Sequence, residues 1–178
     1  MLKMNYNSAM RKEAAIVGST VFFFVAPCSV AGLVPYWISL WQLHPAFFGV
    51  EGVRIFGVAL ALGGLFLVLD SFARFALDGL GTPAPVAPPK NLVVTGLYRH
   101  VRNPMYVGVV SAIAGQALLL GNEALLVYGA VVWLAFHLFV LVYEEPTLKA
   151  TYGDEYDRFR ANVPRWLPRL WPWRAGTA

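Results

Sequence analysis

The residues best suited to chemistry stand at the start of one apolar segment and at the end of the next. The sequence RNPMY at residues 102–106 leads directly into an apolar run, and Glu144 and Glu145 close the run that follows. Polar and ionisable side chains seldom gather at the mouth of an apolar helix unless a polar group has to be held there. We therefore interpret this junction as one wall of a site for a polar ligand.

The order of the segments predicts that these two groups meet. A short turn at 121–123 joins the apolar segments 105–120 and 124–143, which indicates an antiparallel hairpin. Arg102 and Glu144 are then expected within reach of each other. Basic, acidic, amide and phenol groups side by side suit a ligand that carries both charges and an aromatic ring. A cluster of ion pairs that only anchors the hairpin is an equally open interpretation.

The composition favours a membrane protein over a soluble domain. Of the 178 residues, 58% are hydrophobic and only 13% are charged, with a mean hydropathy of +0.57. We predict an all-α fold: one polytopic membrane helix bundle over residues 1–178, with about four transmembrane helices and a cytoplasmic C-terminal amphipathic tail. We interpret that tail as a short helix lying on the membrane surface. The expected spans are 14–38, 53–77, 105–120 and 124–143, with a proline-rich loop at 78–95.

The distribution of Lys and Arg predicts the orientation of the bundle. The segments near residues 44 and 122 are almost free of both, whereas the N-terminus, the junction before residue 105 and the tail after residue 144 are basic. The positive-inside rule then places both termini and the polar loops, with the candidate site, in the cytoplasm. The formal charge of +4 follows from this topology and from contact with anionic lipid headgroups, so a nucleic acid partner is not expected. An obligate protein partner is not indicated either.

Small residues at helical spacing predict where helices approach closely. In the second span, Gly57 with Ala61 and Ala59 with Gly63 stand four residues apart, and Gly108 belongs to a similar small-residue face of the third span. Such faces allow close helix contacts in lipid. We interpret them as packing surfaces.

Other polar residues within the apolar segments carry weaker signals. Asp70 and Arg74 stand four apart and can pair, which we interpret as a structural ion pair in preference to the floor of a polar site. His137 is either a functional group or a neutral histidine bonded to a helix neighbour. Cys28 is the only cysteine, and neither His100 nor His137 has a second histidine at ligand spacing, so a metal site is not predicted.

With these residues in place, the second half of the chain resembles a known group of membrane enzymes. The order LVVTGLY at 92–98, RNPMYVG at 102–108 and the Glu pair at 144–145, with the Leu, Gly and Tyr that follow up to residue 156, is similar to the isoprenylcysteine carboxyl methyltransferase family and its phospholipid N-methyltransferase relatives. The resemblance implies a membrane-embedded methyltransferase that uses S-adenosylmethionine, with the cofactor enclosed in the half of the chain from about residue 80 to 170. It also implies a lipophilic acceptor that enters from the bilayer.

Carried over position by position, the resemblance assigns roles to single residues. Tyr98 and Tyr106 would pack on adenine or approach the sulfonium, Glu144 would face the positive charge of the cofactor, and Arg102 would pair with its carboxylate. Arg102, Glu144 and Glu145 are the residues assigned to catalysis, where a glutamate could take a proton from an amine acceptor. The residues assigned to cofactor binding are Lys90, Asn91, Leu92, Val93, Tyr98, Arg102, Asn103, Pro104, Met105, Tyr106 and Glu144.

Two departures from the carboxyl methyltransferases concern the acceptor. Those enzymes usually have His where this chain has Asn103, and Arg where it has Val140. Asn103 can still form hydrogen bonds, whereas the missing cation at Val140 weakens the case for a prenylcysteine carboxylate and makes the chain more similar to the phospholipid enzymes. An isoprenylcysteine-like carboxylate, a phospholipid amine and a small thiol all stay open as acceptors.

Two other functions are alternatives to a methyltransferase. A membrane reductase of related architecture would bind a nicotinamide cofactor in place of the methyl donor. A non-catalytic membrane scaffold would use the Arg and Glu cluster for folding alone. We prefer the methyltransferase because of the resemblance.

Overall fold

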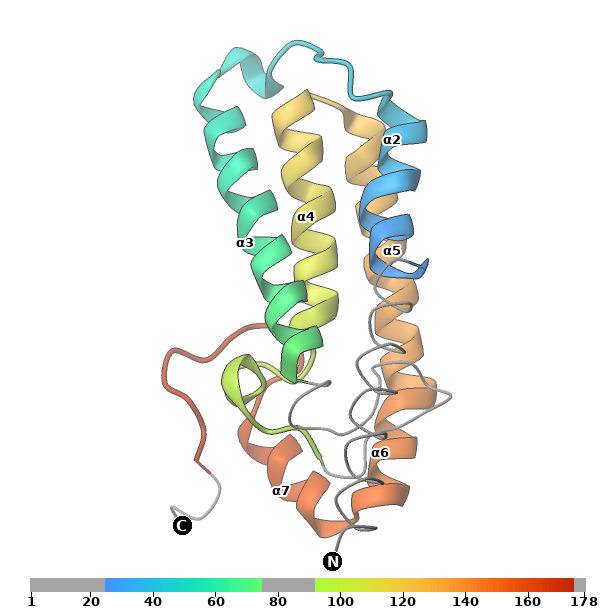
Figure 1. The fold of residues 1–178 in the computed structure, drawn as a ribbon, viewed down its shortest axis with the longest axis vertical. Coiled ribbons are helices and arrows are strands. Elements are labelled where there is room, and N and C mark those ends of the chain that lie inside the picture. The colour runs from blue at the N-terminus through green and yellow to red at the C-terminus, as the bar shows by residue number, and fades with distance from the viewer. Residues whose placement is uncertain (1–24, 75–91, 175–178) are drawn as a thin grey trace, which may run out of the picture.

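The structure is a computed structural model that describes residues 25–74 and 92–174. Within these ranges every regular element is a helix and none is a strand, as predicted for an all-α fold (Figure 1). Elements η1 and η5 are π-helical, and η2 and η4 are 3₁₀ turns. In chain order the elements are η1 (Ser29–Leu33), α2 (Val34–Ser39), η2 (Phe47–Gly49), α3 (Gly52–Arg74), η4 (Gly96–Arg99), α4 (Pro104–Leu120), α5 (Glu123–Phe139), η5 (Val140–Glu144), α6 (Glu145–Tyr152) and α7 (Asp154–Asn162).

Helix α4 is the central element, with α3 on one side of it and α5 on the other (Figure 1). Its residue Ile113 is completely buried. The predicted hairpin is confirmed as α4 and α5. Gly121 ends α4 with a φ of 67°, and the side chain of Asn122 caps α5 by accepting a hydrogen bond from the Leu125 amide at 3.1 Å. The tight turn therefore brings the start of α4 and the end of α5 to the same end of the bundle.

Helices α3 and α4 touch backbone to backbone. A β-carbon added to Gly64 would stand 2.5 Å from the carbonyl oxygen of Gly108, and one added to Gly57 would stand 2.8 Å from that of Gly115. Because these distances leave no space for a side chain, only glycine permits the approach. The predicted close contact is confirmed at Gly57, whereas the second predicted pair, at 59 and 63, is exposed and takes no part in it.

Proline interrupts the first described helix, and neighbouring helices pair the carbonyl groups that it sets free. Pro35 has no amide proton to donate to the oxygen of Ala31. Gln116 of α4 donates to that oxygen at 2.7 Å, and the hydroxyl of Tyr128 in α5 donates to the oxygen of Val30 at 2.9 Å. An unpaired carbonyl is costly in apolar surroundings, so these bonds fix η1 and α2 against the hairpin.

At the end of the bundle away from α6 and α7, Arg54 ties three segments together. Its guanidinium donates to the carbonyl oxygens of Leu119 at 2.6 Å and His44 at 2.7 Å, and it pairs with Glu51 at 2.6 Å. Leu119 lies in the last turn of α4, where the helix dipole favours a cation. Arg54 is therefore a structural cation at this end.

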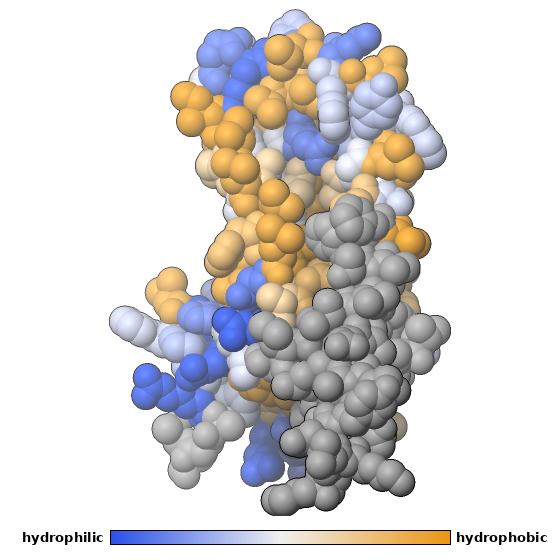
Figure 2. All heavy atoms as spheres, viewed as in Figure 1, coloured by the Kyte–Doolittle hydropathy of each residue, from blue (hydrophilic) through white to orange (hydrophobic). Residues whose placement is uncertain are grey.

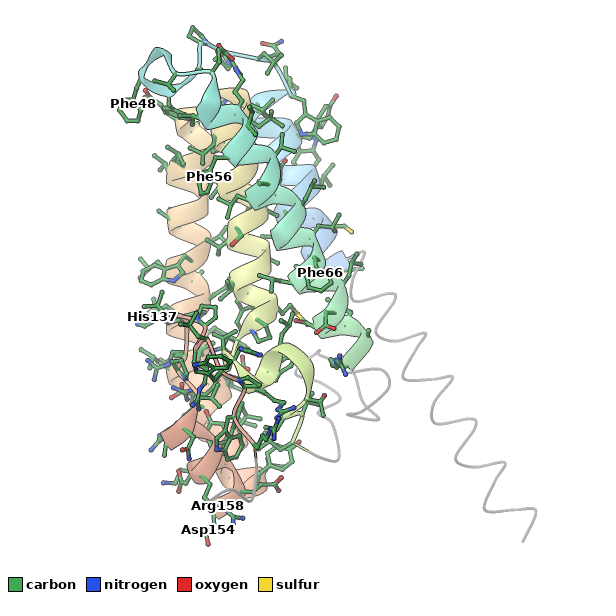
Figure 3. All side chains as sticks on the ribbon, turned by 90° about the vertical axis from the view of Figure 1, so that its left-hand side faces the viewer. Phe48, Phe56, Phe66, His137, Asp154 and Arg158 are labelled. Carbon is green, nitrogen blue, oxygen red and sulfur yellow. The ribbon has the colours of Figure 1, made fainter. Side chains whose placement is uncertain are left out.

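Two helices are long and apolar enough to cross a membrane: α3, and the continuous helix Glu123–Tyr152 formed by α5, η5 and α6. Helix α4 is apolar but shorter. On the coloured part of the face drawn in Figure 2, apolar residues predominate over the middle of the molecule and most strongly polar ones lie near its ends. Phe56 and Phe66 are exposed and point outward from α3 (Figure 3). This distribution is compatible with a membrane helix bundle. Of the first predicted span, only the part from residue 25 onward lies within the described residues.

Two features near the C-terminus differ from the prediction. The fourth apolar helix does not end at residue 143 but continues through Pro146 to Tyr152. The tail, predicted as one short helix on the membrane surface, consists of α6 and α7 followed by residues 163–174, which are not helical and run back along η4 (Figure 1). The difference arises because hydrogen bonds to η4 and the residues after it, described below, satisfy backbone groups of this segment.

Candidate functional site

The π-helical turn η5 places the side chains of the adjacent residues Glu144 and Glu145 in different surroundings. Pro146 has no amide proton to continue the regular ladder, and the amide of Glu145 donates to the oxygen of Val140, five residues back instead of four. Such a turn contains one residue more than an α-helical turn, so it changes which way the following side chains point. Glu144 contacts the first turn of α4, whereas Glu145 faces the C-terminal segment.

Glu144 lies among phenol groups. The hydroxyl of Tyr106 donates to its Oε2 at 2.8 Å, and the Tyr106 ring stacks on Phe136 with centroids 4.5 Å apart. Tyr98 is buried nearby; this burial, with the negative charges of Glu144 and Asp70, raises the pKa of its phenol, so the hydroxyl stays protonated. In the described part of the chain no Lys or Arg lies within ion-pair distance of Glu144.

The predicted pair of Asp70 and Arg74 is present, with Nη2 and Oδ1 3.4 Å apart. The Arg74 guanidinium lies against Gly96 at the start of η4, where an added β-carbon would stand 2.5 Å from its Nε. The other carboxylate oxygen of Asp70 is buried and has no hydrogen-bond partner among the described residues. The pair therefore links the end of α3 to η4, and it also leaves an acidic oxygen near Tyr98.

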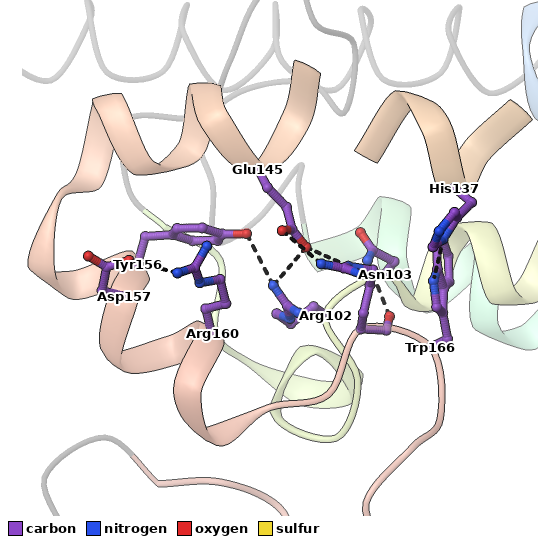
Figure 4. A network of polar contacts seen from close by, with 9 residues as sticks. Arg102, Asn103, His137, Glu145, Tyr156, Asp157, Arg160 and Trp166 are labelled. Carbon is purple, nitrogen blue, oxygen red and sulfur yellow. Dashed lines mark hydrogen bonds and ion pairs between the residues drawn. The ribbon is translucent and has the colours of Figure 1, made fainter. Parts of the chain in front are cut away.

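Glu145 is the centre of a buried ion network (Figure 4). Its Oε1 accepts hydrogen bonds from Arg102 at 2.8 Å and from Arg165 at 2.6 Å, and its Oε2 accepts a second one from Arg165 at 3.0 Å. Arg102 also donates to the phenol oxygen of Tyr156 at 3.3 Å. The side chains of Arg102 and Glu145 are each only 10% exposed. A carboxylate tolerates such burial because two guanidinium groups satisfy both of its oxygens.

Backbone hydrogen bonds fasten the C-terminal segment, residues 163–174, to the junction before α4. In addition, the side-chain amide of Asn103 donates to the carbonyl oxygen of Arg165 at 3.2 Å. Asn103 was predicted to bind the cofactor; in the structure its amide nitrogen is engaged by this segment. The backbone bonds run from Arg102 N to Pro164 O (2.9 Å), from Arg169 N to His100 O (3.0 Å) and from Trp173 N to Arg99 O (2.9 Å).

His137 is part of the same attachment. The indole of Trp166 donates to its Nδ1 at 3.1 Å (Figure 4). The ring of Trp133 stacks on the imidazole with centroids 5.2 Å apart. An indole nitrogen can only donate, so Nδ1 carries no proton in this arrangement. The histidine is hydrogen-bonded as one interpretation predicted, but its partner comes from the C-terminal segment and not from its own helix.

The structure brings some of the predicted site residues together and places others elsewhere. Tyr98, Tyr106 and Glu144 lie together, and Arg102 with Glu145 forms the adjacent network. Of the other predicted cofactor contacts, Val93, Pro104 and Met105 are buried, with Met105 in the core between α3 and α5, and Leu92 packs against α7. Lys90 and Asn91 lie outside the described residues.

Sequence reasoning missed two members of the site. Arg165 was treated only as one of several cations in the tail, because nothing in the local sequence indicates that it reaches Glu145, 20 residues earlier. Phe136 was missed because it stands inside an apolar run, where an aromatic ring is an ordinary packing residue. The only available signal was its position within the helix that carries Glu144.

Arg102 and Glu144 together could hold a ligand that carries both charges. Arg102 Nε is buried and has no hydrogen-bond partner in the described structure. An unsatisfied buried donor costs roughly 1–3 kcal/mol, and a ligand carboxylate would satisfy it. Glu144 offers an oxygen to a cation, and Tyr98 and Tyr106 offer aromatic rings. This set fits the carboxylate, ammonium and sulfonium groups of S-adenosylmethionine, the cofactor that the resemblance implies.

Several known proteins that are similar to this chain carry methyltransferase names. A model of the phospholipid methyltransferase family matches residues 53–155, more than half of the chain. The protein-S-isoprenylcysteine O-methyltransferase of Schizosaccharomyces pombe is 37% identical over 80 residues, 44% of this chain and 34% of the relative. Methanethiol S-methyltransferases of Mycobacterium tuberculosis and Crocosphaera subtropica are 32% and 28% identical, over 85% and 72% of this chain and 64% and 54% of their own. The chain thus spans between about a third and two thirds of the length of these relatives.

Proposed function

The chain belongs to the phospholipid methyltransferase family, and we propose on that premise that it is a membrane-embedded, S-adenosylmethionine-dependent methyltransferase. The observation that carries the proposal is the position of Glu144: a carboxylate held by the Tyr106 hydroxyl, near the buried Tyr98 and next to a network in which Arg102 keeps a free donor. Neither the reductase nor the scaffold alternative draws support from the relatives.

Each residue of the site has a physical role in this proposal. S-adenosylmethionine, when bound, supplies a methyl group that its sulfonium already activates. Glu144 attracts the positive charges of the ligand, and the rings of Tyr98 and Tyr106 favour a cation by their negative faces. The Nε of Arg102 donates to the ligand carboxylate, while its Nη1 stays bound to Glu145. Orientation and exclusion of water are then the main contributions of the protein.

Of the three acceptors that the sequence left open, we propose a small lipophilic thiol. The two relatives that cover most of this chain are named methanethiol S-methyltransferases. A carboxylate acceptor would need a cation, but Val140 is apolar and buried, and Arg165 is engaged by Glu145. A thiol gives up a proton on methylation. Glu144 has an oxygen free of described partners to receive it, whereas both oxygens of Glu145 are taken.

We propose further that the predicted span 14–38, α3, α4 and the helix Glu123–Tyr152 all cross the membrane. Four crossings place both termini on the same side, and we propose that they and the site lie at the cytoplasmic surface. The exposed apolar faces of these helices and the clustering of cations near the site support this orientation. The acceptor would reach the site from the bilayer.

The proposal is tested by titrating the detergent-purified protein with S-adenosylmethionine in a calorimeter, with NADPH as the competing candidate and Glu144→Ala as the variant. We expect saturable binding of the methyl donor, loss of that binding in the variant and none of NADPH. Transfer of a labelled methyl group to a small alkyl thiol, compared with an isoprenylcysteine analogue and phosphatidylethanolamine, tests the acceptor. A folded protein that does not bind the methyl donor would refute the proposal.

A further inference from the structure

Some of the large apolar side chains of residues 163–174 are exposed, whereas others pack against the rest of the molecule. Leu167, Leu170 and Trp171 are 80%, 88% and 79% exposed. By contrast, Trp166 bonds to His137, and the ring of Trp173 packs against α7. Two of the three tryptophans are thus used to attach the segment, and the third is directed outward together with two leucines.

The contacts of this segment set its depth relative to the helices. Helix α3 has 23 residues, which corresponds to about 34 Å and slightly exceeds the roughly 30 Å of a bilayer core. If α3 spans the bilayer, its last residue, Arg74, lies at headgroup level. Gly96 packs against that guanidinium, and the turn that follows Gly96 carries the carbonyl oxygens to which residues 169 and 173 donate. A continuous series of contacts therefore holds the segment at the level where α3 ends.

The charge of the segment fits an anionic surface. Residues 163–174 contain three Arg and neither Asp nor Glu. Arg165 is neutralised by Glu145, whereas the guanidinium of Arg169 donates to a backbone oxygen, that of Asn162. Exposed Trp and Leu beside Arg suit the boundary between headgroups and acyl chains.

We propose that residues 163–174 dock on the anionic surface of the bilayer, with Leu167, Leu170 and Trp171 inserted among the headgroups. The inference rests on the proposed membrane embedding, not on the reaction. Because the same segment holds Arg165 against Glu145 and bonds to the junction at 99–103, docking stabilises one wall of the candidate site. The lipid surface is thereby part of what keeps the site assembled.

The test uses the full chain in phosphatidylcholine and phosphatidylglycerol nanodiscs. Cys28 is the only cysteine, so Cys28→Ala allows one environment-sensitive fluorophore to be placed at Leu170→Cys. The matched control is Arg158→Cys on α7, an exposed position that points away from the bundle (Figure 3). We expect a blue-shifted emission and strong quenching by headgroup-level nitroxide lipids at position 170, and neither at position 158.

Equal, weak quenching at both positions would overturn the proposal. Protection of position 170 from both nitroxide lipids and aqueous iodide would also overturn it, because a protein surface would then cover the segment. The readout needs neither methyl donor nor acceptor, so it stays informative if the proposed reaction is wrong. A label on an exposed residue of α3, Phe66→Cys, reports separately whether that helix lies in lipid. Acyl-chain nitroxide lipids are the quencher there, because position 66 lies about 12 Å along the helix from Arg74. Strong quenching at position 66 without quenching at position 170 isolates the failure to the docking inference.

Discussion

Glu144 and Glu145 are neighbours in the chain, yet they belong to two different polar regions. Glu145 accepts three hydrogen bonds from two guanidinium groups and joins the helix Glu123–Tyr152 to the junction before α4 and to the C-terminal segment. Glu144 accepts one hydrogen bond, from the Tyr106 hydroxyl, and no described cation pairs with it. The two side chains are identical, but only Glu144 keeps a carboxylate oxygen available to a ligand.

The two glutamates differ because guanidinium groups neutralise the charge of Glu145, whereas no described cation neutralises that of Glu144. Breaking a buried, fully paired carboxylate leaves its partners charged and desolvated, so Glu145 is suited to holding the structure together. A carboxylate with a single phenol donor keeps acceptor capacity and electrostatic attraction for a ligand, so Glu144 is suited to binding. The comparison predicts that replacing Glu145 chiefly affects stability and replacing Glu144 chiefly affects ligand binding.

The largest expected effect is that of Glu145→Ala. Loss of the shared acceptor leaves Arg102 and Arg165 uncompensated, which should lower the free energy of unfolding by about 3–5 kcal/mol. Thermal unfolding in detergent measures this. Glu51→Ala is the matched control, since Glu51 also pairs with an arginine but is 77% exposed, and it should change stability by about 1 kcal/mol or less. Equal destabilisation by both changes would contradict the structural role of Glu145.

Glu144→Gln should have the next largest effect, on binding. The amide keeps the shape and the hydrogen bond from Tyr106 but removes the negative charge, so affinity for S-adenosylmethionine should fall by about 1.5–3 kcal/mol, roughly tenfold or more. Calorimetric titration measures the affinity, and thermal unfolding should stay near that of the parent chain. A fall in stability as large as that of Glu145→Ala, with unchanged affinity, would reverse the assigned roles.

Arg165→Lys tests whether geometry matters beyond charge. Lysine keeps the cation but cannot reproduce both bonds of the planar guanidinium to Glu145, so the free energy of unfolding should fall by about 1.5 kcal/mol. Arg160→Lys, at an exposed position on α7, is the control and should be nearly neutral. If both substitutions are neutral in thermal unfolding, the two-bond contact contributes little.

Tyr106→Phe should have the smallest effect. It removes the 2.8 Å hydrogen bond to Glu144 while the ring can still stack on Phe136. We expect the methyl donor to bind about 0.5–1.5 kcal/mol more weakly. Tyr128→Phe removes a phenol hydrogen bond elsewhere, to the oxygen of Val30, and should leave affinity unchanged. Weaker binding in both variants would indicate a general loosening of the bundle.

Several features of the molecule could be read from local sequence. The turn at Gly121 and Asn122 and the apolar runs around it predicted the hairpin, because the conformation of glycine and the hydrophobicity of a run depend on neighbouring residues alone. The pairing of Asp70 with Arg74 follows in the same way from helical spacing. The motif at 102–106 and the glutamate pair identified the candidate site and the family that the comparisons support.

Other features required the tertiary structure. The sequence could not separate the roles of Glu144 and Glu145, because the π-turn before Pro146 and the packing of α4 decide which way each carboxylate points. Nor could it indicate that Arg165 reaches Glu145, since that contact depends on the path of an irregular segment held by backbone bonds to residues 99–102. Composition and spacing determined which elements form and which residue types meet at one end of the bundle. Packing between distant segments decided which of those residues neutralise one another and which stay available to a ligand.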